Sequence, residues 1–466
     1  MNPVLRFPSS LLLAGGAAAG RALRRPALLG AAGCLLFAAT APAQVATNAV
    51  RQSVGGIDLV VLKTGVQEVV TIRGTLAAGD SLSPATNPAI ASLVGGMLDK
   101  GTATHDKFAI SQMLGDVGAG ISFGVSASSL DINAKCLRKD LPLVLALIAE
   151  QLRSPAFAPE EFAKLKKQIA GSMQRALEDP DFRAGDMFSR SVYSPGHPNR
   201  QPAVPDFIAG TDRATLDEVK AFHKQYYGPA TLRLVLVGDV DPVAAQGEIA
   251  KSFAGWTGGV IRTHPSKAGP VDAPRSQTVF MPDKTSVSVV LGQATGLRYN
   301  EPDTLALRIG TAIFGSGFTG RLMANVRDKE GLTYGIYSGV GNDTFVDGDW
   351  SIEASFAPEL LEKGLESTKR QLTAWHRDGV TDAELAQRKS ERAGSYKVGL
   401  STTDGMATTI LATLNRDLEL SFIDQYPGRV AALTKEQVNA AIKKHLDPDK
   451  MILIEAGTVP GAIPKP

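Results

Sequence analysis

The stretch Val219–Val240, VKAFHKQYYGPATLRLVLVGDV, aligns without a gap on Val438–Val459, VNAAIKKHLDPDKMILIEAGTV. Each copy has the residues of a helix end, a proline turn, a short apolar strand and a glycine turn. Earlier in each half, SPAFAPEEFAKLKKQ from Ser154 is similar to RDGVTDAELAQRKSE from Arg377, and both have the pattern of a loop, an N-cap and an amphipathic helix. Internal similarity at a spacing of about 220 residues predicts two copies of one domain.

Each copy opens with short strands and continues with helices. The strands are DLVVL and EVVTIRGTL in the first copy, and QTVFM and SVSVVLG in the second. This order predicts an α+β fold in which each domain has a mainly antiparallel sheet with helices packed on one face. We place the first domain at 44–262 and the second at 276–466, joined by a linker at 263–275 that is rich in Pro, Gly and charge.

The first 43 residues have the pattern of a secretory signal peptide. Four arginines and no acidic residue accompany the apolar run Ala27–Ala39, and the small triplet Ala41-Pro42-Ala43 follows. We therefore expect cleavage before Gln44 and a periplasmic or equivalent exported location. Lipidation of Cys34 is an alternative, but the apolar run continues past that cysteine, which favours ordinary cleavage.

The remaining chain has few features that would bind nucleic acid or a bilayer. Loss of the four leader arginines changes the formal charge from +2 to −2, which leaves no basic field for nucleic acid. No later stretch approaches the roughly 20 apolar residues that a membrane span needs, so we expect no stable membrane insertion. Cys136 would be the only cysteine, and we interpret it as a buried, inert thiol.

Gly315-x-Gly317-x-x-Gly320 has the spacing of a dinucleotide fingerprint, but its context differs. That fingerprint needs a preceding strand, whereas the residues before these glycines place apolar side chains on one helical face. We predict a glycine-rich break between two helices instead. The following GRLMANVRDKEGLTYGIYS predicts a short helix carrying Arg327, stopped at Gly331, and a strand that begins at Leu332 and carries Tyr334.

This last stretch resembles the second-domain signature of the M16 peptidases, the family of pitrilysin, insulinase and the mitochondrial processing peptidase. That signature is a glycine-rich loop, R-L, and then R-x-x-x-G-L-x-Y-x-x-x-S, and the matching residues here are Arg327, Gly331, Leu332, Tyr334 and Ser338. The first half has family counterparts in MLDKGT, LGDVGAGISFGVS, YSPGHPNRQP and YYGPATLRLVLVGDV. The resemblance covers essentially the whole chain after the leader, and it implies two M16-type domains with the three glycines in a substrate loop.

The zinc motif of that family is missing. Active members carry H-x-x-E-H immediately before the M-L-x-K-G-T element, with a distal glutamate as third protein ligand. Here the motif positions read SLVGG, so Ser92 and Gly96 stand at the two histidine positions and Gly95 at the general base. The distal ligand falls near Ser172 or Met173. The resemblance therefore implies that this chain holds no metal and no cofactor of its own.

The histidines do not supply a substitute zinc motif. None of them forms an H-x-x-x-H or H-x-x-E-H pair; they are His105, His197, His223, His264, His376 and His445. His105 could pair with Asp106, but a metal would need a third ligand. We interpret that pair as part of a solvated loop, and His197 as a turn residue.

The resemblance implies a division of labour between two chains. In heterodimeric members one chain carries zinc, while its partner contributes an Arg and a Tyr that donate hydrogen bonds to substrate backbone at the zinc site; Arg327 and Tyr334 match these two. We therefore expect a zinc-free subunit of an exported peptidase, inactive alone, with a zinc-bearing H-x-x-E-H paralogue as partner and a peptide as substrate.

Other interpretations stay open on the sequence. Arg327 could cap a helix or pair with Asp328 or Glu330, and Tyr334 could be a buried strand residue. At the level of the whole protein, the alternatives are a stand-alone peptide-binding or scaffold protein with no peptidase role, and a self-sufficient metallopeptidase with a different site.

Overall fold

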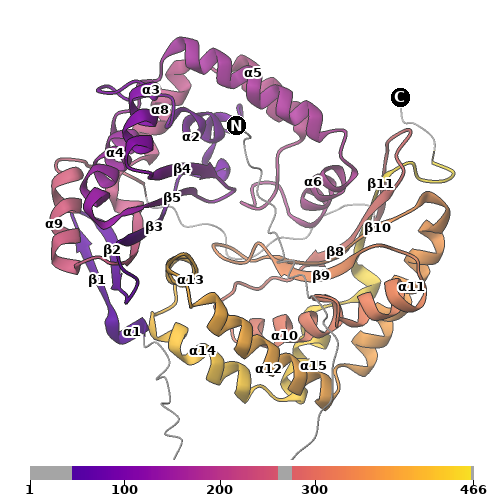
Figure 1. The fold of residues 1–466 in the computed structure, drawn as a ribbon. Coiled ribbons are helices and arrows are strands. Elements are labelled where there is room, and N and C mark those ends of the chain that lie inside the picture. The colour runs from indigo at the N-terminus through magenta and orange to yellow at the C-terminus, as the bar shows by residue number, and fades with distance from the viewer. Residues whose placement is uncertain (1–44, 261–274, 463–466) are drawn as a thin grey trace, which may run out of the picture. The chain divides into compact units, whose positions relative to one another are not determined.

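The computed structural model describes residues 45–260 and 275–462 (Figure 1). The expected signal peptide at 1–43, and the expected linker at 263–275 apart from Arg275, lie outside the described residues. Within the two described ranges, the structure contains no helix with the length and apolar character of a membrane span.

Two sheets form the framework of the molecule. The first has the strand order β1-β2-β6-β3-β5-β4, and the second has the order β7-β11-β8-β10-β9. Neighbouring strands are antiparallel except β2 with β6 and β7 with β11. The strands are β1 (Ala49–Val54), β2 (Ile57–Lys63), β3 (Val69–Leu76), β4 (Gly120–Val125), β5 (Leu130–Leu137), β6 (Arg233–Gly238), β7 (Ser276–Phe280), β8 (Val287–Ala294), β9 (Ile336–Gly341), β10 (Asp349–Phe356) and β11 (Ile452–Gly457).

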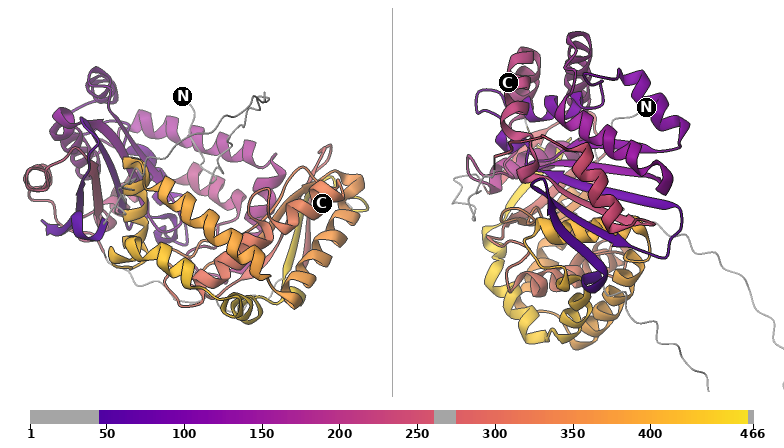
Figure 2. Two further views of the ribbon diagram at one scale, coloured as in Figure 1. Left: turned by 60° about the horizontal axis from the view of Figure 1, so that its bottom comes forward. Right: turned by 90° about the vertical axis from the view of Figure 1, so that its left-hand side faces the viewer.

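Helices occupy most of the remaining described chain, and those of the second half are coloured orange to yellow in Figure 2. The first half has α1 (Val45–Asn48), α2 (Ile90–Met97), α3 (Lys107–Asp116), α4 (Leu141–Arg153), α5 (Pro159–Ala176), α6 (Pro180–Val192), α7 (Val204–Arg213), α8 (Leu216–Tyr226) and α9 (Pro242–Ser252). The second half has α10 (Thr304–Gly315), α11 (Leu361–Asp378), α12 (Asp382–Gly399), α13 (Thr403–Asn415), α14 (Ser421–Ala432) and α15 (Lys435–His445), with a π-helix at Met323–Lys329.

The two aligned stretches of sequence fold in the same way. Helix α8, a 3₁₀ turn at Pro229–Thr231 and strand β6 correspond to α15, a 3₁₀ turn at Pro448–Lys450 and β11. Both helices begin at a capping box, in which a threonine side chain and a Glu or Gln three residues later satisfy each other's backbone N–H groups. The predicted α+β fold with mainly antiparallel sheets is confirmed.

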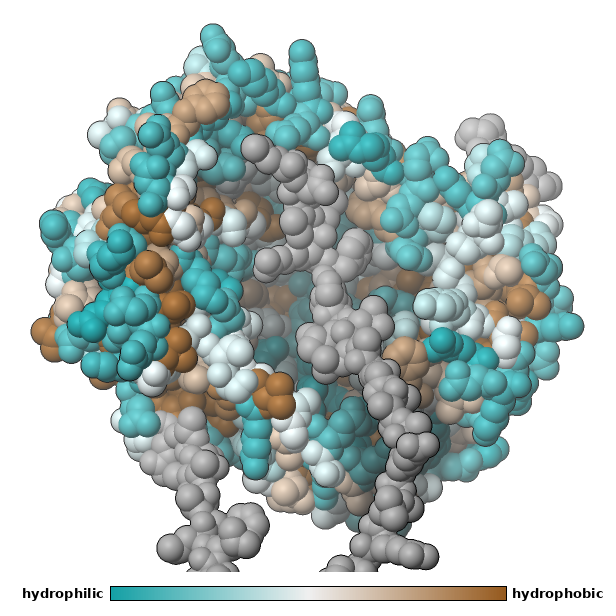
Figure 3. Space-filling model, viewed as in Figure 1, coloured by the Kyte–Doolittle hydropathy of each residue, from teal (hydrophilic) through white to brown (hydrophobic). Residues whose placement is uncertain are grey.

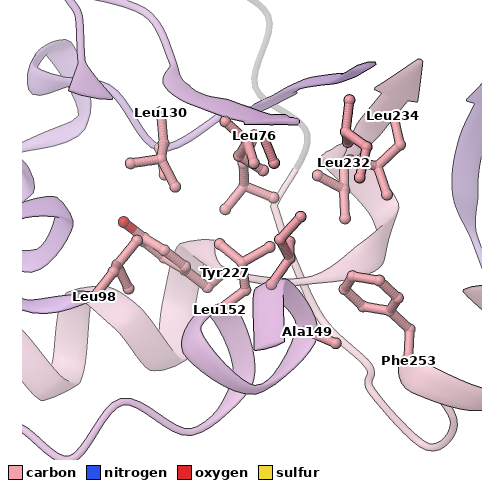
Figure 4. Packing of buried hydrophobic residues seen from close by; sticks show 14 of the residues in the cluster. Leu76, Leu98, Leu130, Ala149, Leu152, Tyr227, Leu232, Leu234 and Phe253 are labelled. Carbon is pink, nitrogen blue, oxygen red and sulfur yellow. The ribbon is translucent and has the colours of Figure 1, made fainter. Parts of the chain in front are cut away.

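One face of the first sheet packs on the helices of the first half. Because side chains alternate along a strand, Leu59 and Val61 of β2 lie on this face with Leu234 and Leu236 of β6. Figure 4 shows part of this core, where Leu98 and Leu130 lie near the ring of Tyr227. On the outer surface in the view of Figure 3, hydrophilic residues predominate and hydrophobic ones form separate patches.

The opposite face of each sheet is covered by a helix from the other half, which the sequence did not predict. Val60 and Val237 of the first sheet pack against α13, which supplies Ile410 and Leu414. In return α6 supplies Phe188 and further apolar side chains to the second sheet, where it contacts β8 and β11 (Figure 1). Each half therefore completes the core of the other.

Polar contacts accompany both exchanged helices. The hydroxyls of Thr71 on β3 and Thr403 on α13 share a buried hydrogen bond of 2.9 Å. After α6, the Tyr193 hydroxyl donates to Asp349 Oδ2 over 2.6 Å, and burial raises the pKa of Tyr193 further above its ordinary value. His197 Nε2 lies 2.9 Å from Asp347 Oδ1. These buried pairs favour one arrangement of the two halves, because any other arrangement would leave a buried polar group without its hydrogen bond, which costs folding free energy.

Candidate functional site

Helix α2 carries the three positions that correspond to the zinc motif. Ser92 donates its hydroxyl to Asp80 Oδ1 over 2.8 Å, and Asp80 belongs to a 3₁₀ turn that precedes the helix. Burial raises the pKa of Asp80 to about 6, and the hydrogen bond from Ser92 offsets only part of that increase. The hydroxyl at the first histidine position thus binds a partly buried carboxyl group.

The other two positions are closed by neighbouring apolar side chains. A Cβ atom added at Gly95 would lie 2.3 Å from Val125 Cγ2, and one added at Gly96 would lie 3.0 Å from Leu165 Cδ2. Val125 ends the edge strand β4, and Leu165 is a buried residue of α5. Val125 therefore fills the space at Gly95, and at Gly96 the end of the Leu165 side chain would have to move by a few tenths of an ångström to admit any side chain.

The remaining donors do not suit zinc either. Ser172 and Met173 lie on α5, and neither a hydroxyl nor a thioether replaces a carboxylate ligand. Within 45–260 and 275–462, no group of three or more His, Cys, Asp or Glu residues is arranged to hold a metal ion. The side chains at this position of the fold therefore do not fit a zinc site.

The described histidines have other partners. The sequence suggests a pair between His105 and Asp106, but in the structure His105 Nδ1 lies 3.0 Å from Glu150 Oε2 instead. Asp106 caps the N-terminus of α3. His197 lies in a turn, as predicted, where its N–H donates to the Ser194 carbonyl, and its ring is buried against Asp347. The other described histidines bind a backbone carbonyl or Asp303: His223, His376 and His445. His264 lies outside the described residues.

The glycine loop follows a helix, as predicted. Helix α10 ends at Gly315, where an added Cβ would lie 2.4 Å from Ser338 Oγ on β9, so only glycine allows this close packing. Gly317 has a φ of 69°, in the region that favours glycine, and Gly320 packs against the backbone of Ser316. These contacts explain the glycines by local backbone geometry, without a phosphate.

Arg321 anchors the end of this loop. Its guanidinium donates to both Glu384 oxygens over 2.6 and 2.7 Å, and to the Gly379 carbonyl over 2.9 Å. Glu384 also accepts hydrogen bonds from Thr381 in the capping box of α12. Although burial alone would raise it, these hydrogen bonds lower the pKa of Glu384 to about 2. The loop is thereby fixed to the start of α12.

The Arg327 guanidinium lies near two exposed aromatic rings. Its guanidinium carbon is 5.2 Å from the ring centre of Phe318 in the glycine loop and 5.2 Å from that of Tyr334. The exposed fraction is 88% for Tyr334 and 63% for Phe318. Such stacking is a cation–π arrangement that holds the guanidinium in place while its N–H groups stay available. Arg327, Tyr334 and Phe318 form what we call the Arg-aromatic cluster.

The structure corrects the predicted strand around Tyr334. Strand β9 begins at Ile336 and not at Leu332, and Tyr334 lies in the preceding loop. The Thr333 hydroxyl donates to the carbonyl of Ser355 and accepts from the Gly335 N–H, so side-chain contacts replace the strand ladder here. The interpretation of Tyr334 as a buried strand residue is therefore wrong.

The ionic alternatives for Arg327 are weak. Its Nε lies 3.9 Å from Asp328 Oδ1, and Glu330 pairs with Arg370 instead. The sequence analysis does not include Phe318 among the site residues. A signal for it exists, because a large apolar residue between Gly317 and Gly320 lies in a loop, where packing seldom requires one. The cluster thus presents a half-buried guanidinium beside an exposed phenol.

Comparison with known proteins places this geometry in a family. The family described as "Insulinase (Peptidase family M16)" matches residues 59–201, and the one described as "Peptidase M16 inactive domain" matches residues 213–391. A solved structure of a peptidase M16 inactive domain from Pseudomonas fluorescens is 27% identical, with a TM-score of 0.82 over 90% of this chain and 99% of that one.

Curated relatives carry two kinds of name. A Mycobacterium tuberculosis protein named an uncharacterized zinc protease is 26% identical over 75% of this chain and 79% of its own length. A Helicobacter pylori protein named the non-peptidase homolog YmxG is 21% identical over 79% of this chain and 84% of its own. Helix α2 has no zinc ligand at the three motif positions, which is in keeping with a resemblance to the inactive members. Because the two M16 matches together span most of the chain, the protein belongs to the M16 (insulinase) peptidase family.

Proposed function

We propose that this chain is the zinc-free subunit of an exported M16-type heterodimeric peptidase. One observation carries the proposal: Val125 fills the space at Gly95 on α2, whereas the half-buried Arg327 keeps its guanidinium beside the ring of the exposed Tyr334. A chain that had lost all part in peptide chemistry would not need two donors held at its surface. The pattern of the first 43 residues supports an exported location.

In this proposal the partner is a paralogue with H-x-x-E-H, and the substrate is a peptide. Zinc bound in the partner would activate water and polarise the scissile carbonyl. Arg327 would donate guanidinium N–H groups, and Tyr334 its hydroxyl, to a substrate carbonyl oxygen that gains charge during the reaction. The ring of Phe318, 5.2 Å from the same guanidinium, would help to hold it in place.

The isolated mature chain provides the first test. It should retain no stoichiometric zinc after dialysis, measured by metal analysis, and it should cleave no quenched peptide. One tightly held zinc per chain would contradict the proposal and would favour a self-sufficient peptidase.

Kinetics of the reconstituted pair provide the second test. Arg327→Ala or Tyr334→Phe should lower kcat with folding and pairing intact, by roughly a hundredfold if a well-aligned donor is worth on the order of 3 kcal/mol. A higher KM with unchanged kcat would mean that the two residues bind the ground state and the transition state equally. Arg377→Ala, at an exposed arginine of α11, is the matched control. Unchanged kinetics in both variants would favour a stand-alone peptide-binding or scaffold protein.

A further inference from the structure

A pocket of about 460 Å³ opens among the helices of the second half. It is bounded by the loop before α10, the first turn of α10, the loop after α13, the helix α14 and the start of α15. The helices α10, α14 and α15 belong to the layer that covers one face of the second sheet (Figure 1). No residue of α2 or of the Arg-aromatic cluster lines the pocket. Ligand pockets usually enclose about 300–1,000 Å³, so this one is large enough for a small molecule.

The apolar wall of the pocket is held by contacts outside it. Leu305, Phe422 and Leu433 line the pocket and also pack against the buried core of the second half. The ring of Tyr299 meets that of Phe422 edge to face, with 6.2 Å between the ring centres. The guanidinium carbon of Arg416 lies 3.5 Å from the centre of the Tyr299 ring. Side chains with such partners are in place before a ligand arrives, which reduces the entropy cost of binding.

Two charged side chains of opposite sign line the same pocket. Glu301 Oε1 accepts the backbone N–H of Arg298 over 3.4 Å. Arg429 donates to the neutral side chain of Gln425 over 2.9 Å, and its guanidinium carbon lies 5.0 Å from the ring centre of Phe422. Among the described residues, neither Glu301 nor Arg429 has an ion-pair partner, and the two do not pair with each other. The pocket therefore combines an apolar wall with one carboxylate and one guanidinium whose charges are not neutralised by a neighbour.

We infer that this pocket binds a small zwitterion with an apolar body, which is the chemistry of an apolar amino acid or of a short apolar peptide with free ends. The ammonium group of the ligand pairs with Glu301 and its carboxylate pairs with Arg429, while its apolar side chains lie against the wall. A ligand with only a negative charge would be repelled by Glu301, and one with only a positive charge by Arg429. The amides of Asn300 and Gln437 also line the pocket and suit the polar atoms of such a ligand.

Isothermal titration calorimetry of the full mature chain tests the inference. The three probes are the dipeptide leucyl-phenylalanine, its N-acetyl derivative, which lacks the ammonium group, and its C-terminal amide, which lacks the carboxylate. The parent chain should bind the free dipeptide at least about fivefold more tightly than either blocked form, because each blocked form loses one charge-assisted contact. Phenylalanine is titrated in parallel to separate the two sources. Equal affinity for phenylalanine assigns a free amino acid as the ligand, and tighter binding of the dipeptide assigns a peptide.

Variants at the two charges should remove these preferences one at a time. In Glu301→Gln the free dipeptide and the N-acetyl form should bind equally, while the preference over the amide is kept. In Arg429→Gln the free dipeptide and the amide should bind equally, while the preference over the N-acetyl form is kept. Arg377→Gln is the matched control, because this exposed arginine of α11 does not line the pocket, and it should keep both preferences. Thermal melts check that each variant is folded.

Three outcomes would overturn the inference. The first is no saturable binding of the dipeptide up to about 10 mM. The second is equal affinity of the parent chain for the free dipeptide and either blocked form, which would mean an unselective apolar pocket. The third is a preference that persists in the variant expected to remove it, which would place the ligand elsewhere. None of these titrations uses peptidase activity, so an inactive reconstituted pair would reject the proposed function and leave this site unaffected.

Discussion

Ser92 Oγ, at the position that corresponds to the first histidine of the family's zinc motif, donates a hydrogen bond of 2.8 Å to Asp80 Oδ1. The two residues come from α2 and from the 3₁₀ turn before it, and Asp80 is partly buried. This hydrogen bond gives the Ser92 hydroxyl a partner from the protein itself, so this position of α2 needs no metal to satisfy it. It also leaves an acidic group whose pKa is raised to about 6.

Asp80→Asn should stabilise the protein at neutral pH. The pKa of Asp80 is raised from 3.8 in the unfolded chain to about 6 in the folded one, so folding disfavours the ionised form. The raised pKa therefore contributes to the free energy of unfolding below about pH 4, where Asp80 is protonated in both states. As the pH rises through 6 this contribution, on the order of 3 kcal/mol, is lost. Asparagine keeps an oxygen for Ser92 and does not ionise.

The measurement is denaturant unfolding of both proteins from pH 4 to 8. The free-energy difference between variant and parent should grow with pH and level off above about pH 7. Asp99→Asn, at an exposed aspartate next to α2, is the control. A constant difference across this range would mean that Asp80 does not titrate there.

Restoring the zinc motif should not restore a zinc site. In Ser92→His with Gly95→Glu and Gly96→His, the new side chains would collide with Val125 and Leu165, and each overpacked position costs about 1–3 kcal/mol. The triple variant should melt at a lower temperature and hold no stoichiometric zinc. Gly171→Ala on α5 is the control, since only the end of Arg175 lies within 4 Å of the added atom. A stable, zinc-loaded triple variant would contradict the packing that we describe.

Phe318→Ala should weaken the action of Arg327 without unfolding the chain. Phe318 is 63% exposed, so its loss leaves the core intact but removes one of the two rings beside the guanidinium. An exposed cation–π contact is worth about 0.5–1 kcal/mol, which predicts a two- to fivefold lower kcat in the reconstituted pair. Phe318→Tyr should recover the parent rate, whereas Phe318→Leu should not. Equal rates for all three variants would assign Phe318 no part in positioning Arg327.

Neither half of the chain should fold alone. Without α13, the outer face of the first sheet would expose Val60, Leu62, Val235 and Val237, and burial of such a side chain is worth about 1.5–3 kcal/mol. Fragments 1–262 and 275–466 should therefore be insoluble separately and soluble when co-expressed, with a circular dichroism spectrum like that of the parent. A folded monomeric fragment would show that the exchanged helices are not needed.

Much of the local structure follows from the sequence. The internal repeat predicts the helix, turn and strand of both halves, because the period of apolar residues and the capping residues are local properties. The lack of zinc ligands at Ser92, Gly95 and Gly96 is equally evident, since side-chain chemistry alone excludes them. The position of the glycine loop between two helices also follows from local features, namely the apolar helical face before it and the glycines themselves.

Only the tertiary structure decided which surfaces meet. An apolar helix face indicates burial but not the partner, so the exchange of α6 and α13 between the two sheets could not be predicted from the sequence. The contacts of Val125 with Gly95, of Asp80 with Ser92 and of Phe318 with Arg327 depend on chain segments brought together by folding. The sequence predicts a strand from Leu332, but β9 begins at Ile336. The Thr333 side chain donates to the Ser355 carbonyl, and this contact replaces a strand hydrogen bond there.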